Sequence, residues 1–344
     1  MVPQPPAIIG YLRCEIGISP EITDLIDEIS QDRSHGASEL ARQAVGVLKT
    51  ATERSQAESA RAFLAEQEDI GQRLVSARPT MAPIYNLINP LLKAITIATE
   101  GQSLEATRQI AMATADEAVN NSLQAVAQTA RYGSRLVADG DRIMTHSYSS
   151  TVVATLKEAF TKVEKGETAI NGASDEGDSE DTEGLKGFEV IVTRSGPVSA
   201  GERTARELGG CGIPVTFIDD TAIGLYLPTV NKVVIGADRI CADGMLVNGI
   251  GTYQRAVACE KNKVPLYVIC ETLKFDLRVK SDQVDPEEKD PSELIDPGSL
   301  PPGTTIKNPY FDITPLEMVT AVVTENGLLT ARNLASVWQD IVAT

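Results

Sequence analysis

Aromatic residues, histidines and positive charges are all scarce in this sequence of 344 residues. Aromatic side chains make up 4% of the chain, and His35 and His146 are its two histidines. Because the hydrophobic fraction is 42%, we expect a sizeable core built mostly from Ala, Val, Ile and Leu. The net charge of −17 argues against binding nucleic acid or an anionic membrane through bulk charge, so we expect neither as a partner.

Paired cysteines and long apolar runs are also absent. The five cysteines are odd in number and contain no C-x-x-C pair, so we expect neither a zinc site nor a disulfide framework. No apolar run reaches the roughly 18 residues of a transmembrane helix. The first residues lack the basic start and apolar stretch of a signal peptide. We therefore expect reduced thiols, a cytoplasmic location and no bound metal.

From Pro20 to about residue 140 the apolar residues recur at helical spacing, as in ISPEITDLIDEI and ASELARQAVGVLKTA. SLEATRQIAMATADEAVNNSLQAVAQTARYG is the longest such stretch. Pro79, Pro83 and Pro90 each predict the limit of a helix, because proline cannot continue the hydrogen-bond ladder. We expect a helical N-terminal domain over residues 1–140.

After residue 140, short apolar runs alternate with helical segments. The runs are RIMTHS, FEVIVTRSG, PVTFIDD, KVVIGADRI and PLYVICET. Apolar strands separated by helices indicate a parallel sheet covered on both faces. We therefore expect an α/β fold, with a Rossmann-like domain over residues 141–344 that binds a ligand and forms oligomers. No G-x-G-x-x-G follows the first run, so we expect no dinucleotide and no other cofactor.

Two polar stretches interrupt this alternation. EKGETAINGASDEGDSEDTEGLKG has few apolar residues, so residues 165–187 are predicted to form a disordered acidic loop. SDQVDPEEKDPSELIDPGSLPPGTTIKNPYFD is rich in proline and aspartate. We expect it to cross the surface before a final strand and helix.

Polar side chains follow the predicted strands. Ligands of open parallel sheets bind beyond the carboxyl ends of the strands. The residues at these ends include His146, Ser147, Arg194, Asp238 and Lys274. Any one of them could be an ordinary turn residue, but together they predict a pocket.

The stretch VIGADRICADGMLVNGIGTYQRAVA carries the most information. Its strand ends at Asp238, and Asp243-Gly244 predicts a hairpin turn. Asp238 is placed for proton transfer, for accepting a substrate hydroxyl or for a structural pairing. The next residues predict a helix start whose free N–H groups and dipole suit a phosphate: Asn248, Gly249, Gly251 and Thr252.

The segments GADRI, ADG and NGIGTYQ are accompanied, in order along the chain, by SHGASELARQA, SARPTMAPIYNLI, IMTHSYSSTV, TRSGP, CETLKFD and NPYFDITPLEMVTAVVTENG. Over about residues 20–335 this set resembles the superfamily of the alpha, beta and delta subunits of translation initiation factor 2B, methylthioribose-1-phosphate isomerase and ribose-1,5-bisphosphate isomerase. The resemblance implies the two-domain fold above and a homodimer or higher oligomer. It also implies a ligand site that includes Arg78 and Pro79 of the R-P-T segment.

The isomerases of this superfamily use a cysteine in T-H-C and an aspartate in G-A-D. This chain keeps Asp238 but has Ser147 at the position of the cysteine. A serine hydroxyl titrates far above neutral pH, whereas a thiol titrates near about 8.5. The replacement removes most acid–base capacity there, and THSYS resembles the initiation-factor branch.

Cations that hold phosphate in the superfamily are missing too. His35, Gly196 and Gly249 stand where the superfamily has arginine, arginine and lysine. Each loss weakens the binding of a doubly phosphorylated sugar by about 1.5–3 kcal/mol. Arg78, Arg239 and Lys274 remain, so a singly phosphorylated sugar or a nucleotide stays open as the ligand.

Two functions stay open. The first is a regulatory protein like initiation factor 2B, which binds a phosphosugar or nucleotide and has initiation factor 2 or paralogous subunits as partners. The alternative is an aldose–ketose isomerase of ribose 1,5-bisphosphate or a related sugar 1-phosphate. Asp238 would then transfer the proton, assisted by Ser147 or Cys241. The missing cysteine and cations favour the first, a protein that is not an enzyme.

Overall fold

The computed structural model describes residues 18–164 and 187–330. The acidic loop predicted over 165–187 lies outside the described residues except for Gly187. The final helix predicted near the end of the chain lies outside them as well.

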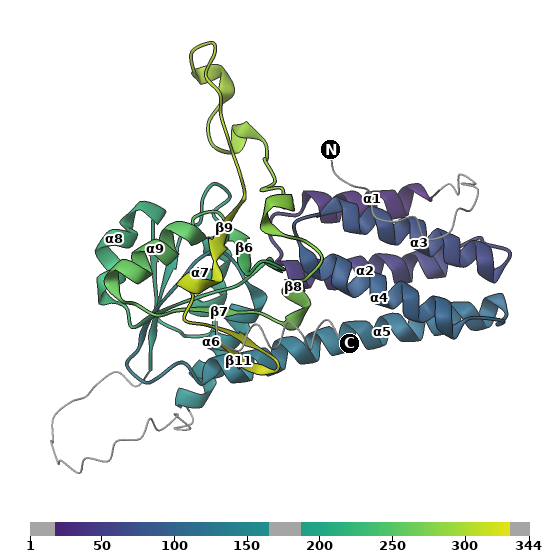
Figure 1. Ribbon diagram of the computed structural model, residues 1–344, viewed down its shortest axis with the longest axis horizontal. Helices are drawn as coiled ribbons and strands as arrows, with labels where there is room; N and C mark the ends of the chain where they lie inside the picture. The colour runs from purple at the N-terminus through teal and green to yellow at the C-terminus, as the bar shows by residue number, and fades with distance from the viewer. Residues whose placement is uncertain (1–17, 165–186, 331–344) are drawn as a thin grey trace.

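Five helices form the first part of the described chain: α1 (Pro20–Gln31), α2 (Ala37–Arg54), α3 (Ala60–Ala77), α4 (Ala82–Ala98) and α5 (Leu104–Ser134). The first four bury mostly apolar side chains, whereas the buried residues of α5 are small. In α1 the buried residues are Ile22, Ile26 and Ile29, at the spacing that aligns side chains along one helix face. The helices lie side by side as a bundle (Figure 1). The helical expectation for this region is therefore confirmed.

The prediction that Pro90 limits a helix is wrong, because α4 runs through it from Ala82 to Ala98. Pro90 is exposed. The hydrogen bond that proline cannot make is therefore lost on the solvent side, where the freed carbonyl costs least. Pro83 stands in the first turn of α4, where proline is favoured.

The main sheet has seven strands in the order β11-β10-β7-β4-β1-β2-β3. All neighbours pair in parallel except the last two strands of the chain, β10 and β11. Their bounds are β1 (Arg142–Thr145), β2 (Glu189–Thr193), β3 (Val215–Ile218), β4 (Lys232–Ile235), β7 (Leu266–Ile269), β10 (Ala321–Thr324) and β11 (Gly327–Leu329). The chain moves outward from β1 in both directions, so the order reverses between β1 and β4. Doubly wound sheets bind ligands in the crevice at such a point.

Helices cover both faces of this sheet, as the alternation predicted. α6 (Ser150–Glu164), α7 (Ala200–Gly209) and the end of α5 pack on one face. α8 (Ile223–Tyr226) and α9 (Thr252–Asn262) pack on the other. The side chains between the sheet and these helices are mostly aliphatic, as expected from the scarcity of aromatics.

A second sheet was not predicted. It contains β8 (Phe275–Asp276), β5 (Arg239–Cys241), β6 (Met245–Gly249) and β9 (Phe311–Pro315), in that order. β5 and β6 form the hairpin expected from Asp243-Gly244, and Gly244 has the positive φ of 75° that such a turn favours. Side chains of this sheet join the core of the helical bundle and so connect it to the main sheet.

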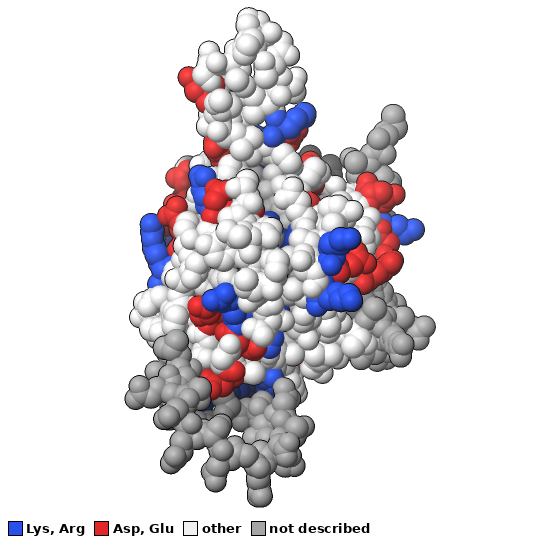
Figure 2. Space-filling model, turned by 90° about the vertical axis from the view of Figure 1, so that its left-hand side faces the viewer, with Lys and Arg blue, Asp and Glu red and all other residues white. Residues whose placement is uncertain are grey.

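Between β8 and β9 the chain leaves the body as an arm with three short 3₁₀ turns (Figure 1). This agrees with the surface crossing expected from its prolines and aspartates. Figure 2 shows basic and acidic side chains mixed on one face of the molecule, without a broad patch of either sign. No helix within residues 18–164 or 187–330 is long and apolar enough to cross a membrane.

Candidate functional site

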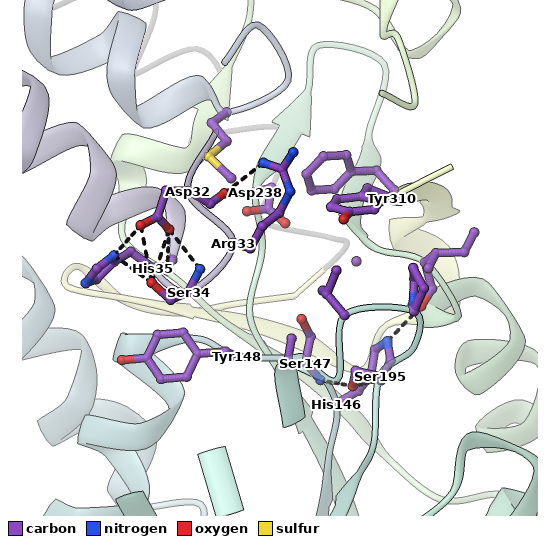
Figure 3. Close-up of a pocket in the computed structure, with 18 of the residues that line it drawn as sticks. Asp32, Arg33, Ser34, His35, His146, Ser147, Tyr148, Ser195, Asp238 and Tyr310 are labelled. Carbon is purple, nitrogen blue, oxygen red and sulfur yellow. Dashed lines mark hydrogen bonds and ion pairs between the residues drawn. The ribbon is translucent and has the colours of Figure 1, made fainter. Parts of the chain in front are cut away.

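A cleft opens at the carboxyl ends of β1, β2 and β4, where the strand order reverses. One wall is the loop between α1 and α2, residues 32–36. The other walls are the residues that follow these strands, together with the start of β9. Figure 3 shows side chains from both parts of the chain around this cleft. The position agrees with the pocket predicted from the strand ends.

His146 lies at the base of the cleft, and its side chain is 1% exposed. Its Nε2 lies 2.9 Å from the carbonyl of Ile250, which can only accept, so Nε2 carries the proton. Its Nδ1 lies 2.8 Å from the hydroxyls of Thr193 and Ser195 and accepts from them. Burial, together with the charge of Arg255, lowers the pKa of His146 to about 3. The ring is therefore a neutral structural group at physiological pH.

Ser147 has a positive φ of 64°, which is uncommon for a residue other than glycine. Two hydrogen bonds hold this backbone in place. Its N–H donates to the Ser195 hydroxyl at 2.7 Å, and its carbonyl accepts from the Thr204 hydroxyl at 2.8 Å. Its own hydroxyl makes no hydrogen bond to a described residue and lies against Gly249. Ser147 therefore lines the cleft with an uncommitted hydroxyl.

Asp238 lines the cleft between the end of β4 and the second sheet. In Figure 3 it lies across the cleft from Ser147. None of the residues in the described ranges donates a hydrogen bond to its carboxylate. Burial raises the pKa of Asp238, although the nearby charges of Lys274 and Arg78 oppose the shift. The carboxyl therefore exchanges its proton closer to neutral pH than an exposed aspartate does.

A smaller hollow lies beside Asp238 and is lined by Asn248 and Lys274 as well. Lys274 is buried, and no described residue accepts a hydrogen bond from its Nζ. Asn248 donates to the Thr252 hydroxyl at 2.9 Å. Thr252 is fully buried and donates in turn to the Gly249 carbonyl. Asn248 and Lys274 thus line this hollow, whereas Thr252 supports the turn behind them.

The helix start predicted to bind phosphate through free N–H groups is occupied by the protein itself. Asp312 accepts from the N–H of Gly251 at 2.7 Å and from the N–H of Tyr253 at 3.1 Å. This carboxylate caps α9, so the expectation of free N–H groups there is wrong. Gly251 has φ of 98°, and a Cβ there would lie 2.3 Å from Arg255 Nη1, so this glycine shapes the turn. Gly249 does line the cleft.

The arginines and the proline expected at the site lie at different positions relative to the cleft. Arg78 is buried and lines the cleft, and its Nε has no hydrogen-bond partner among the described residues. Pro79 lies behind the cleft, where its carbonyl accepts from Arg239 at 2.6 Å. Arg194 is exposed, donates to the Ser199 hydroxyl and faces Asp219 at 4.0 Å. The structure therefore brings Arg78 to the cleft but not Pro79 or Arg194.

Sequence reasoning missed Arg33 and Tyr310, which both line the cleft. Arg33 lies two positions before His35 and follows the end of α1. The polar loop there is the sequence feature that could have indicated Arg33 as a site residue. Tyr310 lies at the end of the arm, far from the other site residues in the sequence. Its hydroxyl donates to Glu293 at 2.5 Å.

Cys241 offers no substitute for a thiol at residue 147. Cys241 lies in β5, is fully buried, lies outside the cleft and packs against the core of the helical bundle. Burial raises its pKa to about 11. The suggestion that Cys241 assists proton transfer is therefore wrong. The described residues contain no cluster of His, Cys, Asp or Glu that could hold a metal ion.

The chain matches the Initiation factor 2 subunit family over residues 33–331 and belongs to it. A ribose 1,5-bisphosphate isomerase from Thermococcus kodakarensis is 31% identical over 91% of this chain and 92% of its own length. The isomerase of that name from Haloferax volcanii is 33% identical over 90% and 89%. The crystal structure of translation initiation factor eIF-2B from Pyrococcus horikoshii OT3 superposes with a TM-score of 0.73 at 29% identity, covering 91% of this chain and 98% of that one.

These similarities confirm the resemblance found from the motifs, and they confirm the α/β fold with its helical N-terminal part. They support the isomerase alternative better than the regulatory function that the sequence favoured. The preference had rested on Ser147 and on the missing cations. The cleft adds Arg33, a cation that this reasoning had not counted.

Proposed function

We propose that the chain is an aldose–ketose isomerase of ribose 1,5-bisphosphate or a related sugar 1-phosphate. The observation that carries the proposal is Asp238, a carboxyl that faces the cleft without a hydrogen-bond donor among the described residues and whose pKa is raised by burial. A general acid–base group works best when its pKa lies near the operating pH. The similarity to two isomerases at 31% and 33% identity supports the same reaction.

The reaction breaks the bond between carbon 1 and the ring oxygen, and the freed oxygen takes up a proton from water in the cleft. One proton then leaves carbon 2 and one arrives at carbon 1, while the hydroxyl on carbon 2 releases its proton to solvent and becomes the ketone. The two carbons are adjacent, so a single carboxyl on one side of the sugar can carry both transfers. Asp238 would take the proton as carboxylate and return it as the acid. Lys274 and Arg78, both buried beside Asp238, would stabilise the negative charge that develops on sugar oxygens between the two steps.

Ser147 would serve this reaction as a hydrogen-bonding group and not as an acid. Its hydroxyl titrates far above neutral pH, so it cannot supply a proton as a thiol would. The Ser147 hydroxyl can still donate a hydrogen bond to a sugar hydroxyl or accept one from it, because it makes no hydrogen bond to a described residue. We therefore assign the acid–base role to Asp238 alone.

The test is conversion of the sugar by the purified protein. Ribose 1,5-bisphosphate is incubated with the protein and the products are followed by phosphorus NMR, which separates a phosphate on the anomeric carbon from one on a ketose. The proposal expects ribulose 1,5-bisphosphate to accumulate in proportion to the protein added. If no ketose forms at any concentration at which the sugar binds, the proposal is refuted.

A second candidate is a regulatory subunit that binds a phosphosugar or nucleotide without converting it. Ser147 is the observation in its favour, because the thiol of the related isomerases is missing. Thermal unfolding with added sugar phosphates and nucleotides tests it, since a ligand of the folded state raises the midpoint. A raised midpoint without turnover, together with capture of initiation factor 2, supports this candidate. Turnover refutes it.

We also propose that the chain assembles with a second copy or with a paralogous subunit. Large apolar side chains are exposed on the part of the chain that holds the main sheet, among them Phe217, Leu225 and Tyr253. Exposed apolar side chains favour association when they form a continuous surface. Sedimentation equilibrium of the purified protein measures the mass directly, and a monomer at micromolar concentration refutes the proposal.

A further inference from the structure

Two guanidinium groups converge on the same wall of the cleft. Nη1 of Arg33 lies 3.4 Å from the Ser30 carbonyl and 3.1 Å from the Asp32 carbonyl. Nη1 of Arg78 lies 3.3 and 2.9 Å from the same two oxygens. Two positive charges thus share one pair of acceptors at the end of α1, which concentrates positive charge at one point.

The surroundings offset this charge only in part. Glu293 faces Nε of Arg33 at 3.7 Å, and the Tyr310 ring lies 5.6 Å from the guanidinium. The Asp32 carboxylate is engaged elsewhere, because it accepts from the N–H groups of Ser34 and His35. Nε of Arg78 is buried without a partner among the described residues. A buried donor that lacks an acceptor costs free energy until a ligand supplies one.

Arg33 and His35 leave this loop in different directions. Figure 3 shows Arg33 extended into the cleft between Asp238 and Tyr310, and His35 turned away toward Asp32. Nδ1 of His35 lies 2.7 Å from the Asp32 carboxylate, so its ring is held against the loop. The Arg33 side chain contacts Tyr310 on one side, and its guanidinium lines the cleft, where a ligand can reach it.

We propose that Arg33 binds the phosphate group of the ligand, together with Arg78, and so supplies the cation that His35 does not. The ligand class is a sugar phosphate monoester, and this choice rests on the proposed function. A phosphate dianion has enough acceptor oxygens to take hydrogen bonds from both guanidinium groups, and such charge-assisted bonds are stronger than neutral ones. Arg33 is then a determinant of affinity and not of proton transfer.

The test is binding of two probes, ribose 1,5-bisphosphate and inorganic phosphate, measured by isothermal titration calorimetry. Arg33→Gln removes the charge and is expected to raise the Kd of the sugar bisphosphate at least tenfold. Arg33→Lys keeps the charge but loses the planar pair of donors, so its Kd is expected to lie between those of Gln and wild type. Arg73→Gln is the matched control, because Arg73 is an exposed arginine on α3 that pairs with Asp69. Its Kd is expected to equal that of wild type.

Circular dichroism of each variant establishes that it is folded, and Arg33→Lys carries the test if Arg33→Gln does not fold. A Kd for Arg33→Gln within twofold of wild type overturns the proposal, as does an equal loss in Arg73→Gln. Absence of binding of either probe to the wild type also overturns it. Binding that depends on Arg33 but produces no ketose would refute the proposed isomerase and leave this inference standing.

Discussion

His146 makes stability depend on pH in a way that can be measured without knowing the ligand. Its pKa falls from 6.5 to about 3 on folding, because the ring is buried and faces the charge of Arg255. The folded protein thus resists protonation of this ring, whereas the unfolded chain takes up a proton below about pH 6.5. The stability that the neutral ring contributes is complete above that pH and is lost as the pH falls toward about 3.

The size of the effect follows from the same two states. At pH 5 the ring is still neutral in the folded protein but almost fully protonated in the unfolded chain. Integrating the difference in bound protons between pH 7 and pH 5 gives a loss of about 2 kcal/mol in the free energy of unfolding. The folded protein does not accommodate a protonated ring, because Nε2 of His146 donates to the Ile250 carbonyl and Nδ1 accepts from the Ser195 hydroxyl. A protonated Nδ1 could no longer accept that hydrogen bond.

The assay is urea unfolding of wild type and His146→Gln at pH 7, 6 and 5. Glutamine does not titrate and can still donate to the Ile250 carbonyl. The variant will be less stable at pH 7, but its loss between pH 7 and pH 5 should be smaller than that of wild type by about 2 kcal/mol. All other titrating groups are common to both proteins, so they cancel in this difference. Equal losses would refute the conclusion that His146 is held neutral in the fold.

Two further substitutions test residues 147 and 251, at or near the cleft. Ser147→Cys should raise the rate of ketose formation, because a thiol gives a proton to the ring oxygen of the sugar more readily than a serine hydroxyl does. Ser76→Cys on an exposed part of α3 is the control, and an unchanged rate in Ser147→Cys contradicts this reasoning. Gly251→Ala should lower the free energy of unfolding by about 2 kcal/mol or more, because alanine is strained at φ 98° and its Cβ would meet Arg255. Urea unfolding measures this, and a loss below about 0.5 kcal/mol contradicts it.

The main sheet was predictable because its strands are apolar runs separated by helices. β1, β2 and β4 each appear in the sequence as such a run. The cleft was predicted at their carboxyl ends, because ligands of parallel sheets bind there. The second sheet was not predictable, because β5 has three residues and β8 has two. Strands this short show no periodicity, and their pairing depends on segments far apart in the chain.

The candidate site was predictable only where a local pattern marks it. Asp238 and Ser147 stand at strand ends, so the position of the strands located them. Asp312 lies 61 residues from Gly251, and no local pattern connects its carboxylate to the start of α9. For the same reason the phosphate site predicted there was wrong. Arg33 reaches the cleft only because the loop after α1 lies beside the carboxyl ends of the strands in the folded chain.

The exposed Asp219 gives Asp238 a matched control. Asp219 follows β3, its side chain is exposed to solvent, and it does not line the cleft. Burial raises the pKa of Asp238, so the charged carboxylate is disfavoured in the folded state. The protonated carboxyl therefore contributes to the free energy of unfolding, and this contribution is lost as the pH rises through the raised pKa. Asp238→Asn should therefore be no less stable than wild type at pH 7, so a loss of turnover cannot be assigned to unfolding.

The most direct test of the central claim is the rate of conversion of ribose 1,5-bisphosphate to ribulose 1,5-bisphosphate by wild type, Asp238→Asn and Asp219→Asn at saturating sugar. If Asp238 transfers the proton, Asp238→Asn should lose at least about 100-fold in kcat, the lower range for removal of a general acid–base group. Asp219→Asn should match wild type. Conversion by Asp238→Asn at the wild-type rate, or no conversion by wild type that binds the sugar, would contradict the account.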